Sequence, residues 1–521
     1  MHSPELESSL APNVNHLAKS AKYESPYDPL EASSHLPFRM PRCDTLIRNV
    51  AVVDGTGTGP QTADVAVDGG VVCAIGQLSQ YTAEQVVEGN GRVLAPGFID
   101  VHTHDDTHVV RDPQMMAKLS QGVTTVIVGN CGISAAPVRL AGAPPDPMNL
   151  LGEADAFRYP TFAAYVKAVD AAQPAVNVAA LVGHTALRNN HMERLDRAAT
   201  GGEIQGMRAQ LSEALHHGAL GLSTGLAYAS ARSAPAEEVL SLAEPLSAAG
   251  AIYTSHMRTE ADEILTAMQE AFSTGRQSHV PVVISHLKCA GIDNWGRSEE
   301  VLHALNTARA VQAVQCDCYP YTASSSTLDL RQVDDRLRIV VTWSTPHPEV
   351  AGQTLAQIAQ AWGTTQLEAA ARLQPAGAIY HNMSEEDVRR ILQHPATMIG
   401  SDGLPNDPRP HPRLWGTFPR VLGYYCRDQR IFSLAEAIHK MTGMPAQRFG
   451  LAQRGRINEG VQADLVLFDP ETIRDTATFS DPISRAEGIA AVWVNGVLSY
   501  KDRDATRQRS GRFLARHTSS S

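Results

Sequence analysis

The chain has 521 residues, of which 43% are hydrophobic and 19% are charged, an ordinary globular composition that excludes wholesale disorder. Its net charge is -11 without a basic cluster in the body of the chain, and its apolar runs are far shorter than the roughly 20 residues of a membrane helix. These features exclude a nucleic-acid partner and a membrane span from our expectations. The seven cysteines are sparse and odd in number, and the first 25 residues lack the apolar core of a secretory signal, so we expect a cytoplasmic protein with reduced thiols.

The two ends of the chain differ from its middle. Residues 1–42 carry Ser, Pro, Asn and charge without a clean period, and we expect a loosely ordered N-terminal extension there. Short β-branched runs broken by Gly, Asp and Asn fill residues 43–95, and the same texture returns in residues 453–515. The sequence therefore predicts a small β-sandwich domain built from both chain ends, with residues 96–452 inserted between its halves.

The middle of the chain alternates continuous apolar runs with helix-like segments whose apolar residues recur at three- and four-residue steps. Eight such runs occupy residues 97–104, 122–132, 176–184, 218–224, 250–256, 280–286, 313–321 and 396–403. This alternation is typical of a parallel sheet covered on both faces, and eight units spread over about 350 residues predict an α/β fold, a (β/α)8 TIM-like barrel. The last two runs are about 75 residues apart, against roughly 30–45 for one unit, so we expect an inserted subdomain near residues 322–390, after strand 7.

Residues that can bind a metal stand where five of the eight runs end, which is where such a barrel places its catalytic groups. The candidate ligands are His102, His104, Cys131, His256, His286 and Asp402. His102 and His104 are two residues apart on a strand, so their side chains point to the same side and can share one cation. Nitrogen, sulfur and oxygen donors suit zinc. Six ligands exceed one tetrahedral site, so the set also accommodates two adjacent metals with a bridging thiolate.

The motifs around these residues resemble those of a known family. GFIDVHTHDD is similar to the opening signature of the amidohydrolase superfamily. The segments GVTTVIVGNCGIS, HTALR, SHMRTE, ISHLK, YPYTASSS, GSDG and HPRLWGTFPRVL resemble the N-acyl-D-amino-acid deacylase (D-aminoacylase) family, and the resemblance spans residues 44–500. Most binuclear amidohydrolases place a carboxylated Lys at the fourth strand tip. Here that tip reads GLSTGL, and Cys131 stands where this family places a metal-binding Cys.

The resemblance implies a zinc-dependent hydrolase that cleaves the linear amide bond of N-acyl-D-amino acids, releasing a carboxylic acid and a free D-amino acid. It implies a tight zinc held by Cys131, His256 and His286. A second, weaker site would consist of His102, His104, Cys131 and Asp402. Asp402 would act as general base and acid for attack by metal-bound hydroxide.

Substrate-binding residues follow from the same resemblance. Lys288 and Tyr319 match residues that bind the substrate carboxylate, and Arg413, in the loop expected over the active site, would assist them. Arg331 and Arg336 stand near the expected side-chain pocket, where family members that prefer D-glutamate or D-aspartate carry a cation. We therefore expect a small-molecule substrate and consider a preference for acidic side chains as a hypothesis.

Three alternatives remain open from the sequence, as does the oligomeric state. The same metal site could hydrolyse a cyclic amide, a ureide or a D-residue dipeptide, which differ only in the pocket that they need. A non-catalytic scaffold on this fold would be expected to lack metal ligands, whereas all six are present here. A metal-dependent lyase or isomerase would release no amine together with a carboxylic acid.

Overall fold

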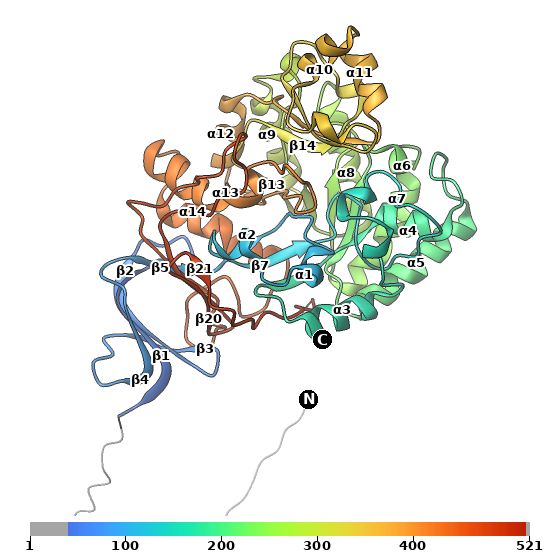
Figure 1. The fold of residues 1–521 in the computed structure, drawn as a ribbon. Helices are drawn as coiled ribbons and strands as arrows, with labels where there is room; N and C mark the ends of the chain where they lie inside the picture. Colours follow the sequence, from blue (N-terminus) through green and yellow to red (C-terminus); the bar gives the residue numbers. More distant parts are fainter. Residues whose placement is uncertain (1–39, 517–521) are drawn as a thin grey trace, which may run out of the picture. The chain divides into compact units, whose positions relative to one another are not determined.

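The computed structural model describes residues 40–516 of the chain, shown in Figure 1. The predicted N-terminal extension lies outside the described residues except for its last three positions, and Arg42 already begins a strand. Residues 42–516 form one compact unit. None of the helices within residues 40–516 is long and apolar enough to cross a lipid bilayer.

A closed ring of parallel strands forms the centre of the described chain. In sequence order the strands are β6 (Phe98–Asp100), β7 (Val123–Val128), β8 (Asn177–Ala180) continued by β9 (Val182–Gly183), β10 (Gly221–Gly225), β11 (Ile252–His256), β12 (Val282–Ile284), β13 (Val314–Cys318) and β17 (Thr397–Ile399). Each pairs in parallel with the next around the ring. A parallel bridge between Thr103 and Gly403 joins the last position to the first. Each predicted apolar run contains one of these positions, which confirms the (β/α)8 barrel.

Helices follow the strands and cover the outside of the barrel (Figure 1). They are α1 (His108–Arg111), α2 (Met116–Leu119), α3 (Phe162–Ala172), α4 (His184–His191), α5 (Gly201–His216), α6 (Ala229–Arg232), α7 (Ala236–Ala249), α8 (Ile264–Ser278), α9 (Ser298–Arg309), α12 (Glu385–Gln393), α13 (Arg413–Arg420), the π-helix η6 (Val421–Asp428), α14 (Leu434–Met441) and α15 (Gly443–Arg448). Local sequence sets their ends. Helix α5 begins at a capping box made by Thr200 and Glu203, and α7 ends at Gly250 in the left-handed conformation.

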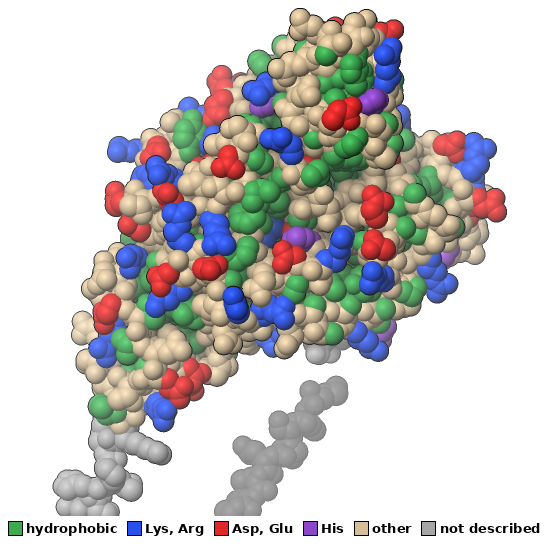
Figure 2. Space-filling model, viewed as in Figure 1, with side chains coloured by type: hydrophobic (Ala, Val, Ile, Leu, Met, Phe, Trp, Pro, Cys, Tyr) green, Lys and Arg blue, Asp and Glu red, His purple; other side chains and the backbone are tan. Residues whose placement is uncertain are grey.

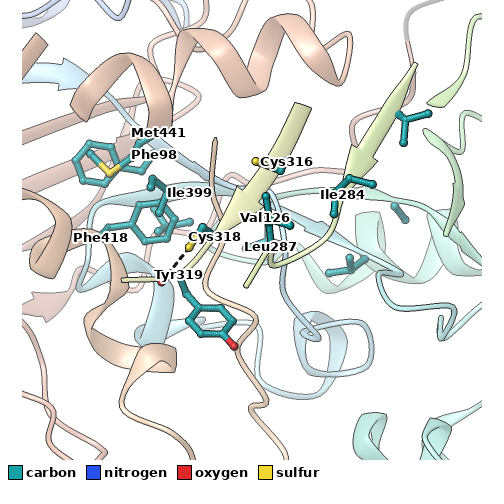
Figure 3. Packing of buried hydrophobic residues seen from close by; sticks show 14 of the residues in the cluster. Phe98, Val126, Ile284, Leu287, Cys316, Cys318, Tyr319, Ile399, Phe418 and Met441 are labelled. Carbon is teal, nitrogen blue, oxygen red and sulfur yellow. Dashed lines mark hydrogen bonds between the residues drawn. The ribbon is translucent and has the colours of Figure 1, made fainter. Parts of the chain in front are cut away.

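Strand side chains alternate between two buried layers, as the two-residue period of a strand requires. Ile127 of β7 and Val283 of β12 belong to the cluster inside the barrel, whereas Val126 and Ile284, their neighbours in sequence, pack outward against the helices. Figure 3 shows part of this outer layer, with Phe98, Phe418 and Met441 side by side. Both faces of the strands are therefore apolar, which explains why their sequences form continuous hydrophobic runs.

Both ends of the chain contribute strands to one nine-stranded sheet. The N-terminal strands are β1 (Arg42–Val52), β2 (Gln61–Asp68), β3 (Val71–Gly76), β4 (Thr82–Glu88) and β5 (Val93–Pro96), and the C-terminal strands are β18 (Leu465–Phe468), β19 (Ile489–Val494), β20 (Val497–Lys501) and β21 (Asp504–Ala505). The halves join where β5 and β18 pair antiparallel. Ile47 and Val65 from one half pack with Leu465 and Trp493 from the other in a shared core, as expected for a sandwich.

An insertion after strand β13 forms a small α/β subdomain. It contains the antiparallel strands β14 (Ser324–Thr327), β15 (Ile339–Ser344) and β16 (Ala376–Tyr380), together with helices α10 (Leu355–Trp362) and α11 (Gln366–Leu373). The following helix, α12, contacts β13 and β17 and so belongs with the barrel helices.

Figure 2 shows acidic and basic side chains interspersed over the face that it draws, so the surface charge there is locally balanced.

Candidate metal centre

The six predicted ligands all lie at the carboxyl ends of barrel strands. His102 and His104 follow β6, Cys131 follows β7, His256 ends β11, His286 follows β12 and Asp402 follows β17. In a parallel barrel these ends meet on one face. Residues separated by up to 300 positions in the sequence are therefore neighbours in space.

Four of these side chains converge on one point. His102, Cys131, His286 and Asp402 each offer a ligand atom, and the four atoms all lie within 4.8 Å of one another. The Cys131 sulfur is 3.2 Å from His102 Nε2 and 3.3 Å from His286 Nε2. All four side chains are buried.

The other two predicted ligands flank this cluster. His104 Nε2 lies 3.1 Å from Asp402 Oδ1, and His256 Nδ1 lies 3.0 Å from His286 Nε2. His256 and His286 also form a second candidate group with Glu260, which the sequence analysis did not single out. The structure thus brings all six predicted residues together and adds a carboxylate beside them.

Three of the predicted ligands occupy an unusual backbone conformation. Cys131, Asp402 and His286 have φ angles of 54°, 50° and 36°, in the left-handed region that residues other than glycine rarely adopt. Such conformations cost about 1–3 kcal/mol each and cluster at functional sites. The tips of these strands are therefore shaped to aim side chains inward at some cost to stability.

The charges of the cluster fit a zinc ion. Burial alone raises the pKa of the Cys131 thiol, but His102 and His286 lower it, and the net pKa is well below its ordinary value. Burial opposes the ionisation of Asp402 as well, yet Arg413 and His104 hold its pKa well below the usual range. A thiolate, imidazoles and a carboxylate at this spacing are the donors that zinc prefers. These residues would hold such an ion.

Two carboxylates contact the outer nitrogens of the histidines. Asp317 Oδ1 lies 3.1 Å from His102 Nδ1 and accepts a hydrogen bond of 2.8 Å from the backbone N–H of His286. Glu260 Oε1 lies 2.7 Å from His286 Nδ1. Partners of this kind fix the tautomer and orientation of metal-binding histidines. The sequence offered a signal for both, since Asp317 is the penultimate residue of a strand and Glu260 follows one closely, but neither position by itself indicates which histidine it contacts.

A buried lysine connects the first and last strand tips. Lys118 is fully buried, and its Nζ donates to Asp100 Oδ2 at 2.8 Å and to Ser401 Oγ at 3.0 Å, and lies 3.1 Å from Asp105 Oδ2. Burial alone lowers the pKa of Lys118, but the two carboxylates raise it above its ordinary value, so the ammonium stays charged. This network holds the His102–His104 segment against the turn that carries Asp402.

A cavity of about 370 Å³ opens onto the cluster, with walls formed by the barrel strand tips and the inserted subdomain. Lys288 and Tyr319 line it together with His104, His256 and Asp402. The Tyr319 hydroxyl is buried, finds no hydrogen-bond partner within residues 40–516, and points away from the hydrophobic residues labelled in Figure 3. A buried hydroxyl without a hydrogen-bond partner lowers the stability of the fold, and a ligand in the cavity can supply that partner.

The two predicted arginines lie in different surroundings. Arg413 is buried, does not line the cavity, and its Nη2 lies 2.9 Å from Asp402 Oδ2, while its guanidinium stacks 4.6 Å from the centre of the Tyr319 ring. Arg331 lines the cavity, but its Nη2 already contacts Asp329 Oδ2 at 2.5 Å. Arg336 lies outside this cavity and contacts two other acidic residues.

Comparison with known proteins identifies the family. The model of the amidohydrolase family matches residues 85–500. The chain is 50% identical to the D-aminoacylase of Alcaligenes xylosoxydans xylosoxydans over 91% of its own length and 98% of that protein. The chain belongs to the D-aminoacylase group of the amidohydrolase family.

Two further amidohydrolases extend the comparison. An N-acyl-D-aspartate deacylase of Alcaligenes xylosoxydans xylosoxydans is 47% identical over 91% of this chain and 95% of that protein. The crystal structure of an N-acyl-D-glutamate deacylase from Bordetella bronchiseptica, complexed with zinc and a phosphonate mimic of the tetrahedral intermediate, superposes with a TM-score of 0.88 at 45% identity, covering 91% of this chain and all of that one. Relatives at similar distance thus act on different D-amino acids.

Proposed function

We propose that this amidohydrolase cleaves N-acyl-D-amino acids to a carboxylic acid and a free D-amino acid in a zinc-dependent reaction. The observation that carries the proposal is the convergence of His102, Cys131, His286 and Asp402 beneath a cavity that also presents Lys288. The names of the close relatives support the reaction and the D configuration.

Zinc at this cluster supplies Lewis acidity to the scissile amide. The remaining chemistry belongs to the side chains. Asp402, on the cavity wall, takes a proton from the attacking water and returns it to the leaving nitrogen. Arg413 and His104 hold Asp402 in place through contacts of 2.9 Å and 3.1 Å.

Substrate orientation depends on two other residues that line the cavity. The Lys288 ammonium and the Tyr319 hydroxyl bind the carboxylate of the amino acid, and Lys288 Nζ lies 5.7 Å from the centre of the Tyr319 ring. Arg413 does not line the cavity and assists indirectly, because its guanidinium stacks 4.6 Å from the centre of the Tyr319 ring. Fixing the carboxylate at one end of the substrate presents the amide to Asp402 in a single orientation.

A paired assay of zinc-loaded enzyme tests the proposal. N-acetyl-D-amino acids and their L-enantiomers, with leucine, methionine, phenylalanine, glutamate and aspartate side chains, are offered, and release of the amine is followed. We expect turnover of D-forms only, and a loss of about 10²–10⁴-fold in Asp402→Asn, since that is what general acid-base groups contribute. Asp112→Asn, whose side chain is 56% exposed, is the control. Turnover confined to cyclic amides or D-residue dipeptides contradicts the proposal.

The side-chain preference is tested at Arg331. A substrate carboxylate in its vicinity competes with Asp329 for the same guanidinium, so an acidic preference requires Arg331 to exchange partners. Arg331→Ala is expected to reduce turnover of N-acetyl-D-glutamate far more than that of N-acetyl-D-leucine. Equal losses remove the acidic preference and leave the deacylase reaction intact.

The thiolate chemistry of the site also suits a reducing compartment. All seven cysteines are free, and the predicted ligand Cys131 is among them. Because oxidation of that sulfur would remove a zinc ligand, we propose that the enzyme acts in the cytoplasm.

A further inference from the structure

One carboxylate lies between a zinc ligand and a lysine. Glu260 Oε1 is 2.7 Å from His286 Nδ1 and 2.5 Å from Lys288 Nζ. Lys288 Nζ is also 2.8 Å from His286 Nδ1, so the three groups form a triangle. Their side chains are 14%, 2% and 5% exposed, which leaves little room for water to provide other hydrogen-bond partners.

The two nitrogens of His286 face different surroundings. Its Nε2 faces the metal cluster, 3.3 Å from the Cys131 sulfur. A neutral imidazole carries one proton, and it binds a cation through the nitrogen that lacks it. His286 therefore binds a metal through Nε2 only when Nδ1 carries the proton.

Lys288 opposes this arrangement because of its chemistry. An ammonium group has three donors and no acceptor, so at 2.8 Å from Nδ1 it can only donate to an unprotonated Nδ1. That contact favours the tautomer in which Nε2 carries the proton and cannot bind a metal. A lysine that donates to Nδ1 of a metal-binding histidine therefore opposes metal binding through Nε2.

We propose that Glu260 is a positioning residue that removes this competition. Its carboxylate accepts a hydrogen bond from His286 Nδ1–H, which keeps Nε2 free for the metal, and it holds the Lys288 ammonium at the same time. The lysine can then stand beside a metal ligand and still face the cavity. His102 provides an internal comparison, since its Nδ1 faces Asp317 at 3.1 Å and its contacts within residues 40–516 include no lysine.

Zinc affinity, measured by competition with a chelating indicator on the full chain, tests the proposal. Glu260→Gln keeps the size of the side chain but removes the negative charge that holds the Lys288 ammonium away from His286 Nδ1. We expect zinc affinity to fall by about 10–100-fold, as for other partners of metal-binding histidines. Lys288→Met alone is expected to leave zinc affinity unchanged.

The double variant distinguishes the proposed role from others. In Glu260→Gln/Lys288→Met the competing donor is gone, so zinc affinity is expected to return most of the way to the wild-type value. If the double variant binds zinc as weakly as Glu260→Gln, Glu260 acts as a ligand or by packing, and the proposal is wrong. Unchanged affinity in Glu260→Gln is equally incompatible with it. Glu263→Gln, an exposed acid three residues away, is the matched control.

Two measures keep the test decisive. If Glu260→Gln does not fold, Glu260→Asp, with and without Lys288→Met, asks the same question, because the shorter side chain draws the carboxylate away from His286 and Lys288. The role of Lys288 toward substrate rests on the proposed function and appears separately, as a raised KM in Lys288→Met. Absence of deacylase activity in the wild type would overturn the proposed function and leave the zinc measurements to decide the role of Glu260.

Discussion

Replacement of the buried lysine that connects the first and last strand tips should destabilise the whole fold. Lys118→Met retains most of the stem and removes the ammonium, which leaves the carboxylates of Asp100 and Asp105 buried without their cation. Removing one member of a buried charged group costs about 3–5 kcal/mol, because the remaining charge stays desolvated.

The expected thermal shift follows from the size of the protein. An unfolding entropy of about 2.1 cal/mol/K per residue over roughly 480 residues gives about 1 kcal/mol per degree, so the melting temperature should fall by about 3–5 °C. Scanning calorimetry at a fixed scan rate and fixed zinc concentration measures it. Lys167→Met, on the exposed side of α3, is the matched control and should change stability by less than about 0.5 kcal/mol.

The double variant Lys118→Met/Asp100→Asn provides the decisive comparison. Because the substitution at Asp100 removes one of the orphaned charges, the double variant should be more stable than the sum of the two single changes predicts. Additive losses, or a Lys118→Met shift no larger than that of Lys167→Met, would show that the buried ammonium does not stabilise the strand tips.

Three other measurements test separate parts of the structure. Burial lowers the pKa of His394 to about 4, and its Nδ1 accepts a hydrogen bond of 3.2 Å from the Ala396 N–H. Because this pKa lies below the ordinary 6.5, the folded protein keeps its full stability above pH 6.5 and loses up to about 1.4 kcal/mol per pH unit as the pH falls toward 4. The melting temperature of His394→Asn should therefore depend less on pH between 6.5 and 4 than that of the wild type. Ile284→Ala in the outer barrel core should lower the free energy of unfolding, measured by denaturant titration, by about 2–5 kcal/mol. Val311→Ala, at a side chain that is 73% exposed, should lower it by less than about 0.5 kcal/mol. Chelation of zinc should lower the melting temperature, by the equivalent of about 2.7 kcal/mol when zinc had been present at 100 times its Kd, and Cys131→Ala should lose most of this response.

Much of the barrel could be predicted because its strands are buried on both faces. A strand such as β7, with Val126 facing the helices and Ile127 facing the interior, has no polar position to interrupt its sequence, so the run of residues marks the strand directly. The same runs mark where the strands end, and the predicted ligands stand at these ends. The first inserted strand gave no such signal, because Ser324–Thr327 consists of small hydroxyl residues.

The contacts behind the predicted ligands could not be predicted in the same way. Lysine is usually exposed, and the burial of Lys118 depends on Asp100 and Ser401, which come together only when the barrel closes. Glu260 belongs to an acidic stretch that is typical of a solvated helix start. Arg413 was expected at the substrate, and its contact with Asp402 depends on where α13 passes over the barrel, which no local pattern encodes.

The sheet built from both chain ends has a consequence during synthesis. Strand β5 is fully buried in the finished protein, yet its partner β18 follows roughly 370 residues later. At about 5–20 residues per second, the ribosome needs about 20–70 s to produce that partner. For this interval an apolar strand edge emerges without the segment that will cover it, and such edges pair readily with other chains. The nascent protein is therefore most exposed to aggregation while its barrel is still being translated.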